Sequence, residues 1–578
     1  MVPTETLTPA LRGCAFLTES TEPAAVFTAE DLTPEHLAIA RTTDEFFVNE
    51  VEPNLEAIRG KDYATARRVL RKAAAIGLTA VPIPERFGGM EMDLASVMLV
   101  AEHLASDASY GGWHSAHTGI GTLPVLYFGS EAQKQKYLPK LASVDLLAAY
   151  ALTEPQAGSD SLGARTRADL NPEGTHYILN GQKMWITNGG AADIFTVFAK
   201  VGGDKFTAFL VERAFPGVTS GAEELKMGIK GTSTTAVYFD NVPVPVENVL
   251  GEVGRAHIIA FNVLNVGRMK LGAATTGAGK YVLGVCLKYV KQRRAFGSSI
   301  SEFGAIRHKV AEMAIRIYAG ESMLWRVAGL IESKMKEIAD ANPDPLQAEL
   351  KAVEEYAAEC SMIKVFCSEA LNFVVDEGVQ IHGGYGFHQH YAVERCYRDS
   401  RINRLFEGTN EINRLVIAGM PLKRAARGQN DILEAAAAAP VPDQNPDPEI
   451  RIVNNAKRAA LYVIGQAYKK HGAALDKQQE IMMNIADMMM EVLAMESSVM
   501  RARKLAAQKK GANAAGMAAV YVRDAMARIE NSARNVLGEC SPSGFSLLKT
   551  LTSVDPIDAI GLRRSIAERL LGRESYGV

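Results

Sequence analysis

Residues 379–415 read VQIHGGYGFHQHYAVERCYRDSRINRLFEGTNEINRL and combine a helix end, a glycine-rich turn and the start of another helix. Glu407 and Gly408 stand just before that second helix. A carboxylate beside a glycine leaves an open approach for substrate, and partial burial raises its pKa toward the range of a general base. A helix cap is the alternative interpretation, because acidic residues at helix starts commonly serve only as partners of the helix dipole.

Hydrophobic spacing around this stretch predicts a mostly α protein with a small β domain. DYATARRVLRKAAAIG and HKVAEMAIRIYAGESMLWRVA carry apolar residues at three- and four-residue spacing, which indicates helices. KFTAFLVE and TTAVYFDNVPVP are typical of strands. We expect a helical N-terminal domain, an antiparallel β middle domain, a helical-bundle third domain, a linker and a C-terminal helical domain, at residues 37–148, 149–250, 251–425, 426–449 and 450–578.

Three local patterns refine this organisation. Asn180-Gly181 lies between two β-prone runs and predicts a hairpin. The alanines and prolines of residues 435–448 favour an extended linker. The segment starting at Ala486 matches the segment starting at Ala311, with Ala, Met, Ala, Glu, Ser and Arg shared at a constant offset of 175 residues. This match indicates a decayed duplication of part of the third domain, with chance similarity as the alternative.

The composition excludes several classes of protein. Apolar residues make up 47% of the 578 residues and charged residues 22%, which is typical of a globular chain. A formal charge of −3 provides no field to attract nucleic acid. The six cysteines contain no CxxC pair, and the N-terminus lacks the pattern of a signal peptide. No apolar run is long enough for a transmembrane helix. We therefore expect a cytoplasmic protein.

Three further stretches carry groups that suit a large cofactor. YALTEPQAGSD, residues 150–160, ends in a Gly-Ser turn whose backbone N–H groups suit an anion or a polar ring edge. MWITN, residues 184–188, places Trp185 and Thr187 on alternate residues of a strand. QRRAFG, residues 292–297, ends a long helix with two arginines. Taken singly, each has an ordinary alternative: a turn, a core tryptophan and a solvated face.

In this order, YALTEPQAGSD, MWITN, RRAFG, QIHGGYGF and FEGTNEI resemble the acyl-CoA dehydrogenase family of flavoproteins. The resemblance covers about residues 37–422. The added C-terminal part looks most like the very-long-chain branch of that family. The resemblance implies FAD as the cofactor and conversion of an acyl-CoA thioester to a trans-2-enoyl-CoA in fatty acid β-oxidation.

The resemblance also implies a role for each matched residue. Glu407 corresponds to the catalytic base that removes the α-proton, while flavin N5 takes the β-hydride. Some family members carry the base on another helix, where this chain has Gly267, so that location is empty. The backbone N–H of Glu407 would stabilise charge on the thioester oxygen, as an oxyanion hole does. The residues matching FAD-binding positions are Tyr150, Leu152, Thr153, Gly158, Ser159, Trp185, Ile186, Thr187, Arg293, Phe296, Gln380, Gly384, Thr409 and Glu411.

Substrate contacts follow from the same match. The positions expected near the CoA or acyl moiety are Ser159, Asn265, Arg268, Phe406 and Gly408. Many relatives carry Asp where this chain has Asn265. The chain-length prediction, a long acyl group, depends on the branch resemblance and on small residues at Gly111, Gly112 and Ser115, which would leave room at a pocket floor that Trp113 could close.

The resemblance implies electron-transferring flavoprotein as the electron acceptor. It also implies a homodimer, because Arg293, Phe296, Gln380 and Gly384 match positions that contact the FAD of a neighbouring subunit. The C-terminal domain would then occupy a surface that shorter relatives use to form tetramers. Two alternatives stay open: an acyl-CoA oxidase that reduces oxygen, and a non-catalytic assembly scaffold with this fold.

Two weaker features complete the sequence-based predictions. No metal site is expected, because His382, His388 and His390 lack a carboxylate or cysteine at a ligand spacing. A peripheral membrane contact is the minority interpretation for the C-terminal domain. Its only local support is the apolar run AALYVIGQAY with flanking basic residues Lys457, Arg458, Lys469 and Lys470. The methionines at 482–490 are most simply a core stripe.

Overall fold

A computed structural model of the chain describes residues 11–340 and 344–578. This part of the chain divides into two compact units. The β-sheet unit comprises Thr33–Gly277 and Pro343–Leu350, and the helical unit comprises Met1–Leu32, Ala278–Asn342 and Lys351–Val578, so far as these residues are described. The boundary after Gly277 falls inside the 37-residue helix α8 (Ala256–Gln292).

The β-sheet unit begins with short helices whose starts are fixed by polar side chains. Asp62, Asp93 and Asp107 each accept a hydrogen bond from a backbone N–H of the first turn, and Ser130 forms a capping box with Gln133. The helices are α1 (Pro34–Phe46), α2 (Leu55–Arg59), α3 (Tyr63–Ala75), α4 (Leu94–His103), α5 (Ala108–Ala116), α6 (Leu123–Phe128) and α7 (Glu131–Ala142).

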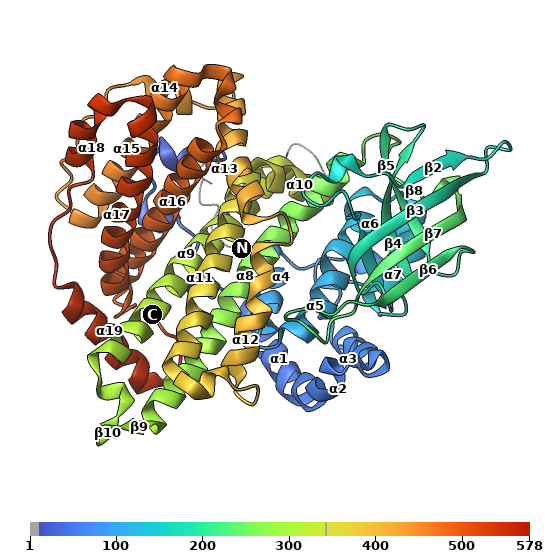
Figure 1. Cartoon of the computed structure of the whole chain (residues 1–578), viewed down its shortest axis with the longest axis horizontal. Coiled ribbons are helices and arrows are strands. Elements are labelled where there is room, and N and C mark those ends of the chain that lie inside the picture. Colours follow the sequence, from blue (N-terminus) through green and yellow to red (C-terminus); the bar gives the residue numbers. More distant parts are fainter. Residues whose placement is uncertain (1–10, 341–343) are drawn as a thin grey trace. The chain divides into compact units, whose positions relative to one another are not determined.

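The strands of this unit form one sheet in the order β6-β7-β3-β2-β4-β5-β8, with β1 also paired to β4 (Figure 1). Most pairings are antiparallel, but β1 and β2 run parallel to β4, so the sheet is mixed rather than purely antiparallel as predicted. Between β2 and β4 the chain passes through β3, which runs antiparallel to β2, so the chain reverses direction twice and β4 runs in the same direction as β2. The strands are β1 (Ala148–Ala151), β2 (Arg167–Leu170), β3 (His176–Thr187), β4 (Ile194–Val201), β5 (Lys205–Glu212), β6 (Val218–Glu223), β7 (Thr234–Pro245) and β8 (Val249–Leu250).

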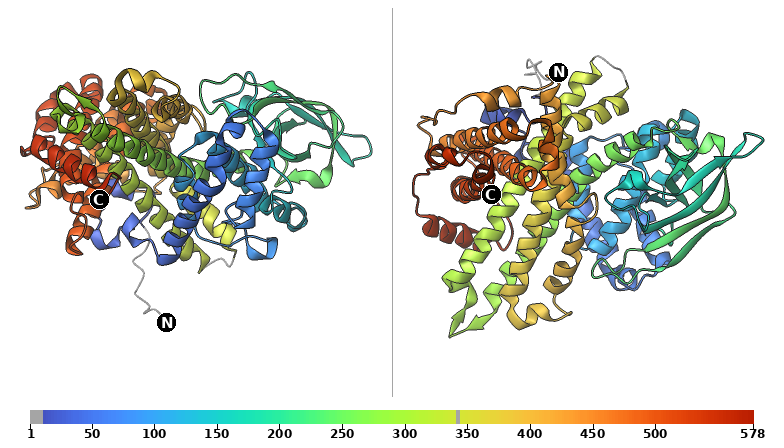
Figure 2. Two further views of the ribbon diagram at one scale, coloured as in Figure 1. Left: turned by 90° about the horizontal axis from the view of Figure 1, so that it is seen from below. Right: turned by 45° about the horizontal axis from the view of Figure 1, so that its top comes forward.

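The predicted hairpin at Asn180-Gly181 is wrong. Both residues lie inside the continuous strand β3, which pairs with β2 on one side and β7 on the other. Figure 2 shows this sheet from two further directions. The pairing with β7 shifts register between Leu179 and Gly181, so the glycine marks a bulge rather than a turn. A Cβ atom on Gly181 would lie 2.6 Å from Thr166 Oγ1, which explains why the strand needs glycine there.

The helical unit contains the C-terminal part of α8 and a set of long helices (Figure 1). A two-stranded ribbon of β9 (Arg294–Ala295) and β10 (Ser298–Ser299) follows α8. The further helices are α9 (Gly304–Ala339), α11 (Ala357–His382), α12 (Ala392–Ser400), α13 (Asn410–Ala426), α14 (Ile432–Ala437), α15 (Pro448–His471), α16 (Gln479–Ala507), α17 (Ala514–Cys540), α18 (Phe545–Leu551) and α19 (Ala559–Arg573), while α10 (Pro345–Glu355) has residues in both units.

The segment predicted as a linker, residues 426–449, is not extended throughout. Its helix α14 buries Ile432 and Ala436. Gly465 of α15 permits this close packing, because a Cβ atom there would lie 2.2 Å from the Ala436 backbone oxygen. The prolines that suggested an extended chain follow α14 and lead into α15, where Pro448 occupies the first helical position.

The two segments related by 175 residues lie on α9 and α16, which contact each other. Their matched residues form reciprocal ion pairs: Arg326 Nη2 lies 2.7 Å from Glu496 Oε2, and Arg501 Nη1 lies 2.6 Å from Glu321 Oε2. All four side chains are almost fully buried. Each arginine thus reaches the helix that carries the other copy of the motif.

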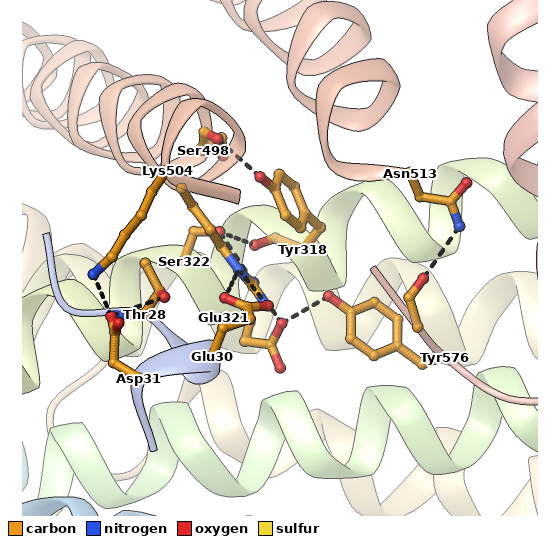
Figure 3. Close-up of polar contacts among 12 residues, drawn as sticks. Thr28, Glu30, Asp31, Tyr318, Glu321, Ser322, Ser498, Lys504, Asn513 and Tyr576 are labelled. Atoms are coloured by element: carbon orange, nitrogen blue, oxygen red, sulfur yellow. Dashed lines mark hydrogen bonds and ion pairs between the residues drawn. The ribbon is translucent and has the colours of Figure 1, made fainter. Parts of the chain in front are cut away.

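The pair formed by Glu321 and Arg501 has further partners (Figure 3). Arg501 also binds Glu30 of the N-terminal segment at 2.6 Å, and the Tyr576 hydroxyl donates to Glu321 Oε2 at 2.8 Å. Lys280 of α8 forms an ion pair with the same Glu321. One buried site therefore connects both ends of the described chain to α8, α9 and α16.

Three of the four basic residues that suggested a membrane contact form ion pairs within the chain, whereas Lys469 is exposed. Lys457 is buried and lies 2.5 Å from Glu496 Oε1, while Arg458 and Lys470 pair with Asp443 and Glu539. The apolar positions of the same helix face the core. Most of the methionines at 482–490 are also buried, as a core stripe requires. None of the described helices is long and apolar enough to cross a membrane.

A buried carboxyl group anchors the N-terminal segment. The backbone N–H of Cys14 donates to Glu359 Oε1 at 2.5 Å. Burial, with a contribution from Glu355, raises the pKa of Glu359 to about 7, whereas an exposed glutamate titrates near 4.5. The folded chain therefore binds this proton more tightly than the unfolded chain does, so Glu359 stabilises the fold below pH 4.5 and progressively loses this contribution up to about pH 7.

We expect Glu359→Gln to remove this pH dependence. Glutamine keeps the acceptor for Cys14 and stays neutral, so at pH 8 the variant should be more stable than wild type by roughly 1–3 kcal/mol. Thermal unfolding midpoints of the FAD-free proteins at pH 5 and pH 8 measure the effect. An equal difference between variant and wild type at both pH values would contradict it.

Candidate active site

The segment after β1 is bonded to β3 at a break in the β3–β7 pairing. The backbone N–H of Met184 donates to the Thr153 oxygen at 2.9 Å, and Lys183 Nζ donates to the Leu152 oxygen at 3.1 Å. The register shift between Lys183 and Ile186 places Trp185 in a bulge with φ of 59°. This bulge turns the indole outward, and 54% of Trp185 is exposed.

A buried ion pair stabilises the same segment. Lys183 Nζ lies 2.7 Å from Glu154 Oε1, and both side chains are almost completely buried. Glu154 also accepts hydrogen bonds from the backbone N–H groups of Arg165 and Thr166. Burial lowers the pKa of Lys183 to about 8, although the Glu154 carboxylate opposes this shift. The sequence analysis missed this pair, although a lysine next to MWITN in a strand was a usable signal.

The other predicted residues of this group lie in the same unit in different environments. Tyr150 is buried in β1 and contacts Phe198 edge to face at 5.0 Å. Ile186 is buried, whereas Thr187 is partly exposed. Gly158 and Ser159 are exposed, and nothing lies within 4 Å of where a Cβ atom on Gly158 would stand. The structure therefore brings a half-exposed indole and an open glycine turn into one unit.

Asn265 and Arg268 are bonded to each other on α8. Arg268 Nη1 donates to Asn265 Oδ1 at 2.8 Å, and both residues are buried in the β-sheet unit. Their spacing of three residues places them on one face of the helix. The Asn265 amide therefore orients the Arg268 guanidinium. An aspartate at this position would orient it too and would add a negative charge.

The predicted open pocket floor is not present at Gly112. A Cβ atom there would lie 2.5 Å from Thr232 Oγ1, so the neighbouring segment already fills the space. Trp113 is fully buried and donates from Nε1 to the Gly231 oxygen at 2.9 Å. The small residue allows close packing rather than a cavity, and it gives no support to the chain-length prediction.

In the helical unit, Arg293, Phe296 and Gly384 line a common pocket of about 610 Å³. Arg293 lies over the Tyr385 ring at 5.4 Å, and Phe296 is 97% exposed. A Cβ atom on Gly384 would meet nothing within 4 Å. Gln380 is exposed near the end of α11. This part of the surface offers an aromatic ring, a cation and open backbone.

His382 packs and forms a hydrogen bond within the wall of this pocket. His382 stacks on Tyr289 with ring centroids 3.9 Å apart, and its Nδ1 lies 2.8 Å from the Gly378 oxygen.

Among the described residues, His471, Glu539 and Cys540 place their ligand atoms within 4.8 Å of one another. Lys470 lies 2.5 Å from the Glu539 carboxylate and competes for it.

Glu407 occupies a tight turn immediately before α13. Its φ is 57° and that of Gly408 is 81°, so two successive residues have left-handed backbone conformations. Thr409 caps the helix, accepting from the backbone N–H of Ile412 at 3.2 Å. A hydrogen bond from its own backbone N–H lowers the pKa of the Glu411 carboxyl below its ordinary value, and a hydrogen bond from the Thr409 side chain contributes less. The side chain of Glu407 is only partly buried, as is required for contact with a ligand.

Two buried side chains that the sequence analysis missed donate hydrogen bonds to the carbonyl groups of this turn. Lys364 Nζ donates to the Gly408 oxygen at 2.8 Å, and Asn413 Nδ2 donates to the Gly408 and Thr409 oxygens at 2.8 and 3.0 Å. Left-handed conformation at a non-glycine residue is costly, and it persists only where the surroundings enforce it. The turn that carries Glu407 is therefore imposed by its neighbours.

Family models of acyl-CoA dehydrogenases match most of the chain. They describe the N-terminal domain at residues 33–145, the middle domain at 149–242, and C-terminal domains at 257–420 and 455–546. This succession of domains defines a flavin-dependent oxidoreductase. The chain belongs to the acyl-CoA dehydrogenase family.

Individual relatives support this assignment. A probable acyl-CoA dehydrogenase of Bacillus subtilis is 45% identical over 98% of both chains. The solved acyl-CoA dehydrogenase of Bacillus anthracis, complexed with FAD, is 44% identical with a TM-score of 0.95, covering 98% of this chain and all of that one. The bovine mitochondrial very long-chain specific acyl-CoA dehydrogenase is 43% identical over 61% of this chain and 52% of its own length.

FAD is the cofactor of this enzyme, and its residues suit the group. The half-exposed Trp185 presents an aromatic plane, while Gly158 and Gly384 leave backbone open for close approach. Arg293 offers a cation for a phosphate or a ring edge. Each unit by itself therefore offers features that suit a flavin ring or a dinucleotide chain.

Proposed function

We propose that the protein oxidises a long-chain acyl-CoA to the trans-2-enoyl-CoA in fatty acid β-oxidation, with Glu407 as the base. The observation that carries the proposal is the turn at Glu407, whose left-handed backbone is held by hydrogen bonds from buried Lys364 and Asn413. A strained turn that carries a carboxylate and is held by several hydrogen bonds is typical of a catalytic position.

In this proposal the carboxylate of Glu407 accepts the α-proton of the thioester. Its own backbone N–H donates to the thioester oxygen and stabilises the negative charge that develops there. Phe406, 39% exposed beside it, and Gly408 contact the acyl part. When bound, FAD supplies the acceptor for the β-hydride. Asn265 orients Arg268 toward the polar part of the substrate.

We assign FAD contacts to the remaining predicted residues. In the β-sheet unit these are Tyr150, Leu152, Thr153, Gly158, Ser159, Trp185, Ile186 and Thr187, with Ser159 also contacting substrate. In the helical unit we assign FAD contacts to Thr409 and Glu411. Arg293, Phe296, Gln380 and Gly384 contact the FAD of a second copy of the chain, so the proposal includes a homodimer.

A long acyl chain and electron-transferring flavoprotein are the proposed substrate class and acceptor. The similarity to very long-chain specific acyl-CoA dehydrogenases and the additional C-terminal helices support the chain length. The free cysteines support a cytoplasmic location. An oxidase is the competing function, because the solved prolyl acyl carrier protein oxidase AnaB matches 68% of this chain with a TM-score of 0.60 and 28% identity.

Anaerobic titration of the purified yellow protein tests the proposal. Butyryl-, octanoyl- and palmitoyl-CoA are added in turn while the flavin absorbance is followed. We expect palmitoyl-CoA to bleach the flavin fastest, because its chain gains binding energy from apolar contacts. Fastest bleaching by butyryl-CoA would overturn the chain-length assignment, and no bleaching by any substrate would favour the scaffold.

The electron acceptor is tested on the reduced protein. We expect little hydrogen peroxide in air and rapid reoxidation when electron-transferring flavoprotein is added. Stoichiometric peroxide without that partner would identify an oxidase instead.

A further inference from the structure

Lys364 is a buried lysine that makes its hydrogen bonds to the turn of Glu407. It lies on α11 between the buried residues Ile363 and Val365, and none of its surface is exposed. Its Nζ donates to the Gly408 oxygen at 2.8 Å and to Asn410 Oδ1 at 2.7 Å. Burying an ammonium group is expensive, so its retention here needs a reason beyond packing.

The position of these acceptors explains what the lysine does. The Gly408 carbonyl belongs to the peptide that joins Gly408 to Thr409, one residue after Glu407, and holding it fixes that peptide plane. Asn413 Nδ2 donates to the same oxygen from α13, and it also donates to the Glu407 oxygen, at 3.4 Å, in the preceding peptide. Donors from two helices therefore restrict both peptides of the turn, and the backbone from which the Glu407 side chain leaves is restricted with them.

The support continues into the C-terminal helices. Asn410 Nδ2 donates to Glu369 Oε1 at 2.9 Å, and Glu369 receives both terminal nitrogens of Arg414 at 2.8 and 3.0 Å. Arg414 Nε then donates to Asp487 Oδ1 of α16 at 2.7 Å. Bidentate contacts of this type fix orientation as well as distance. A series of side-chain contacts therefore joins the turn to α16, a helix of the C-terminal region.

We propose that Lys364 is a positioning residue for Glu407, and that the contacts through Asn410, Glu369 and Arg414 to Asp487 extend this support to the C-terminal helices. The inference rests on the proposed function, in which Glu407 is the base. It assigns a role in catalysis to part of the C-terminal region, for which the family resemblance implied a role in assembly, with a membrane contact as the minority interpretation.

The test compares Lys364→Met with Lys457→Met. Lys457 is a matched control, because it is also buried in the helical unit and donates to a backbone oxygen, that of Glu19, and to a side-chain oxygen, that of Glu496. Both variants lose a buried ammonium group, and both are expected to unfold at lower temperature than wild type. Only Lys364 contacts the turn.

The decisive measurement is the single-turnover rate of anaerobic flavin reduction by palmitoyl-CoA, expressed per bound flavin, together with the substrate dissociation constant. A misplacement of the base by about 1 Å lowers the rate roughly 100-fold, so we expect a loss of that order in Lys364→Met with substrate affinity unchanged. Lys457→Met should reduce its remaining flavin at the wild-type rate. A role in stability alone would lower the amount of folded protein in both variants but not the rate per flavin.

Two further variants separate the possible failures. Lys364→Arg keeps a donor and should recover part of the lost rate. Asp487→Asn, at the far end of the chain of contacts, tests the inference if Lys364→Met does not fold, and it should lower the rate less than Lys364→Met. Wild-type rates in Lys364→Met, or in Asp487→Asn when the first variant cannot be obtained, would overturn the inference. If Glu407→Gln also reacts at the wild-type rate, the proposed base itself is wrong.

Discussion

Replacing Glu407 by glutamine is expected to abolish most flavin reduction while the protein stays yellow. The amide has nearly the shape of the carboxylate, so the turn and its bonds to Lys364 and Asn413 are retained. It cannot accept the α-proton, and removal of a general base typically costs 10²–10⁴-fold in rate, so we expect a loss of about that size. Stopped-flow absorbance under anaerobic conditions measures the rate directly.

Glu530→Gln is the matched control for this experiment. Glu530 lies on α17, pairs with Arg534 one turn later and is partly exposed. The same chemical change there removes a surface ion pair and should leave the rate of flavin reduction as in wild type. Equal rates in Glu407→Gln and Glu530→Gln would exclude Glu407 as the base and require another proton acceptor.

The second large effect is expected on stability, from Arg501→Met. Although burial raises the pKa of Glu321, the Arg501 guanidinium and then Lys280 lower it to about 2 in the folded chain, so this carboxyl is held as an anion. Methionine fills much of the arginine volume but leaves Glu321 and Glu30 without that charge partner. Removing one member of a buried ion pair costs about 3–5 kcal/mol, and the thermal unfolding midpoint should fall accordingly.

Two comparisons show whether the charge is the cause. Arg534→Met removes a surface arginine paired with Glu530 and should cost at most about 0.5 kcal/mol. Adding Glu321→Gln to Arg501→Met removes the carboxylate that has lost its arginine partner, so the double variant should be more stable than the sum of the single changes predicts. A midpoint in Arg501→Met as high as in Arg534→Met would show that the buried pair contributes little.

The sequence predicted those features that depend on residues close to one another along the chain. The helical and β-rich segments follow from local periodicity, and Glu407 is the candidate base proposed from the Glu-Gly-Thr pattern and the family motifs around it. The prediction at Asn180-Gly181 failed because the local turn preference is overridden by pairing on both sides of β3 and by the close approach of Thr166. No local pattern contains that information.

The residues that support the site were harder to predict for a similar reason. A lysine on a helix is usually exposed, and the partners of Lys364 lie 44 and 46 residues further along the chain. Its position inside the apolar run SMIKVFC was the one available signal. The open space predicted at Gly112 was likewise filled by Thr232, which lies far away in sequence. Contacts of this range require the folded structure.

The reciprocal ion pairs of α9 and α16 also have a consequence for how this protein can evolve. In a symmetric homodimer, both equivalent ion pairs are encoded by the same codons, so any mutation changes both pairs at once. Here Glu321 with Arg501 and Glu496 with Arg326 are encoded separately, and each pair has its own neighbours: Tyr576 and Glu30 for one, Lys457 and Thr21 for the other. Because both segments lie in one chain, one ion pair can change by mutation while the other preserves the contact between the helices.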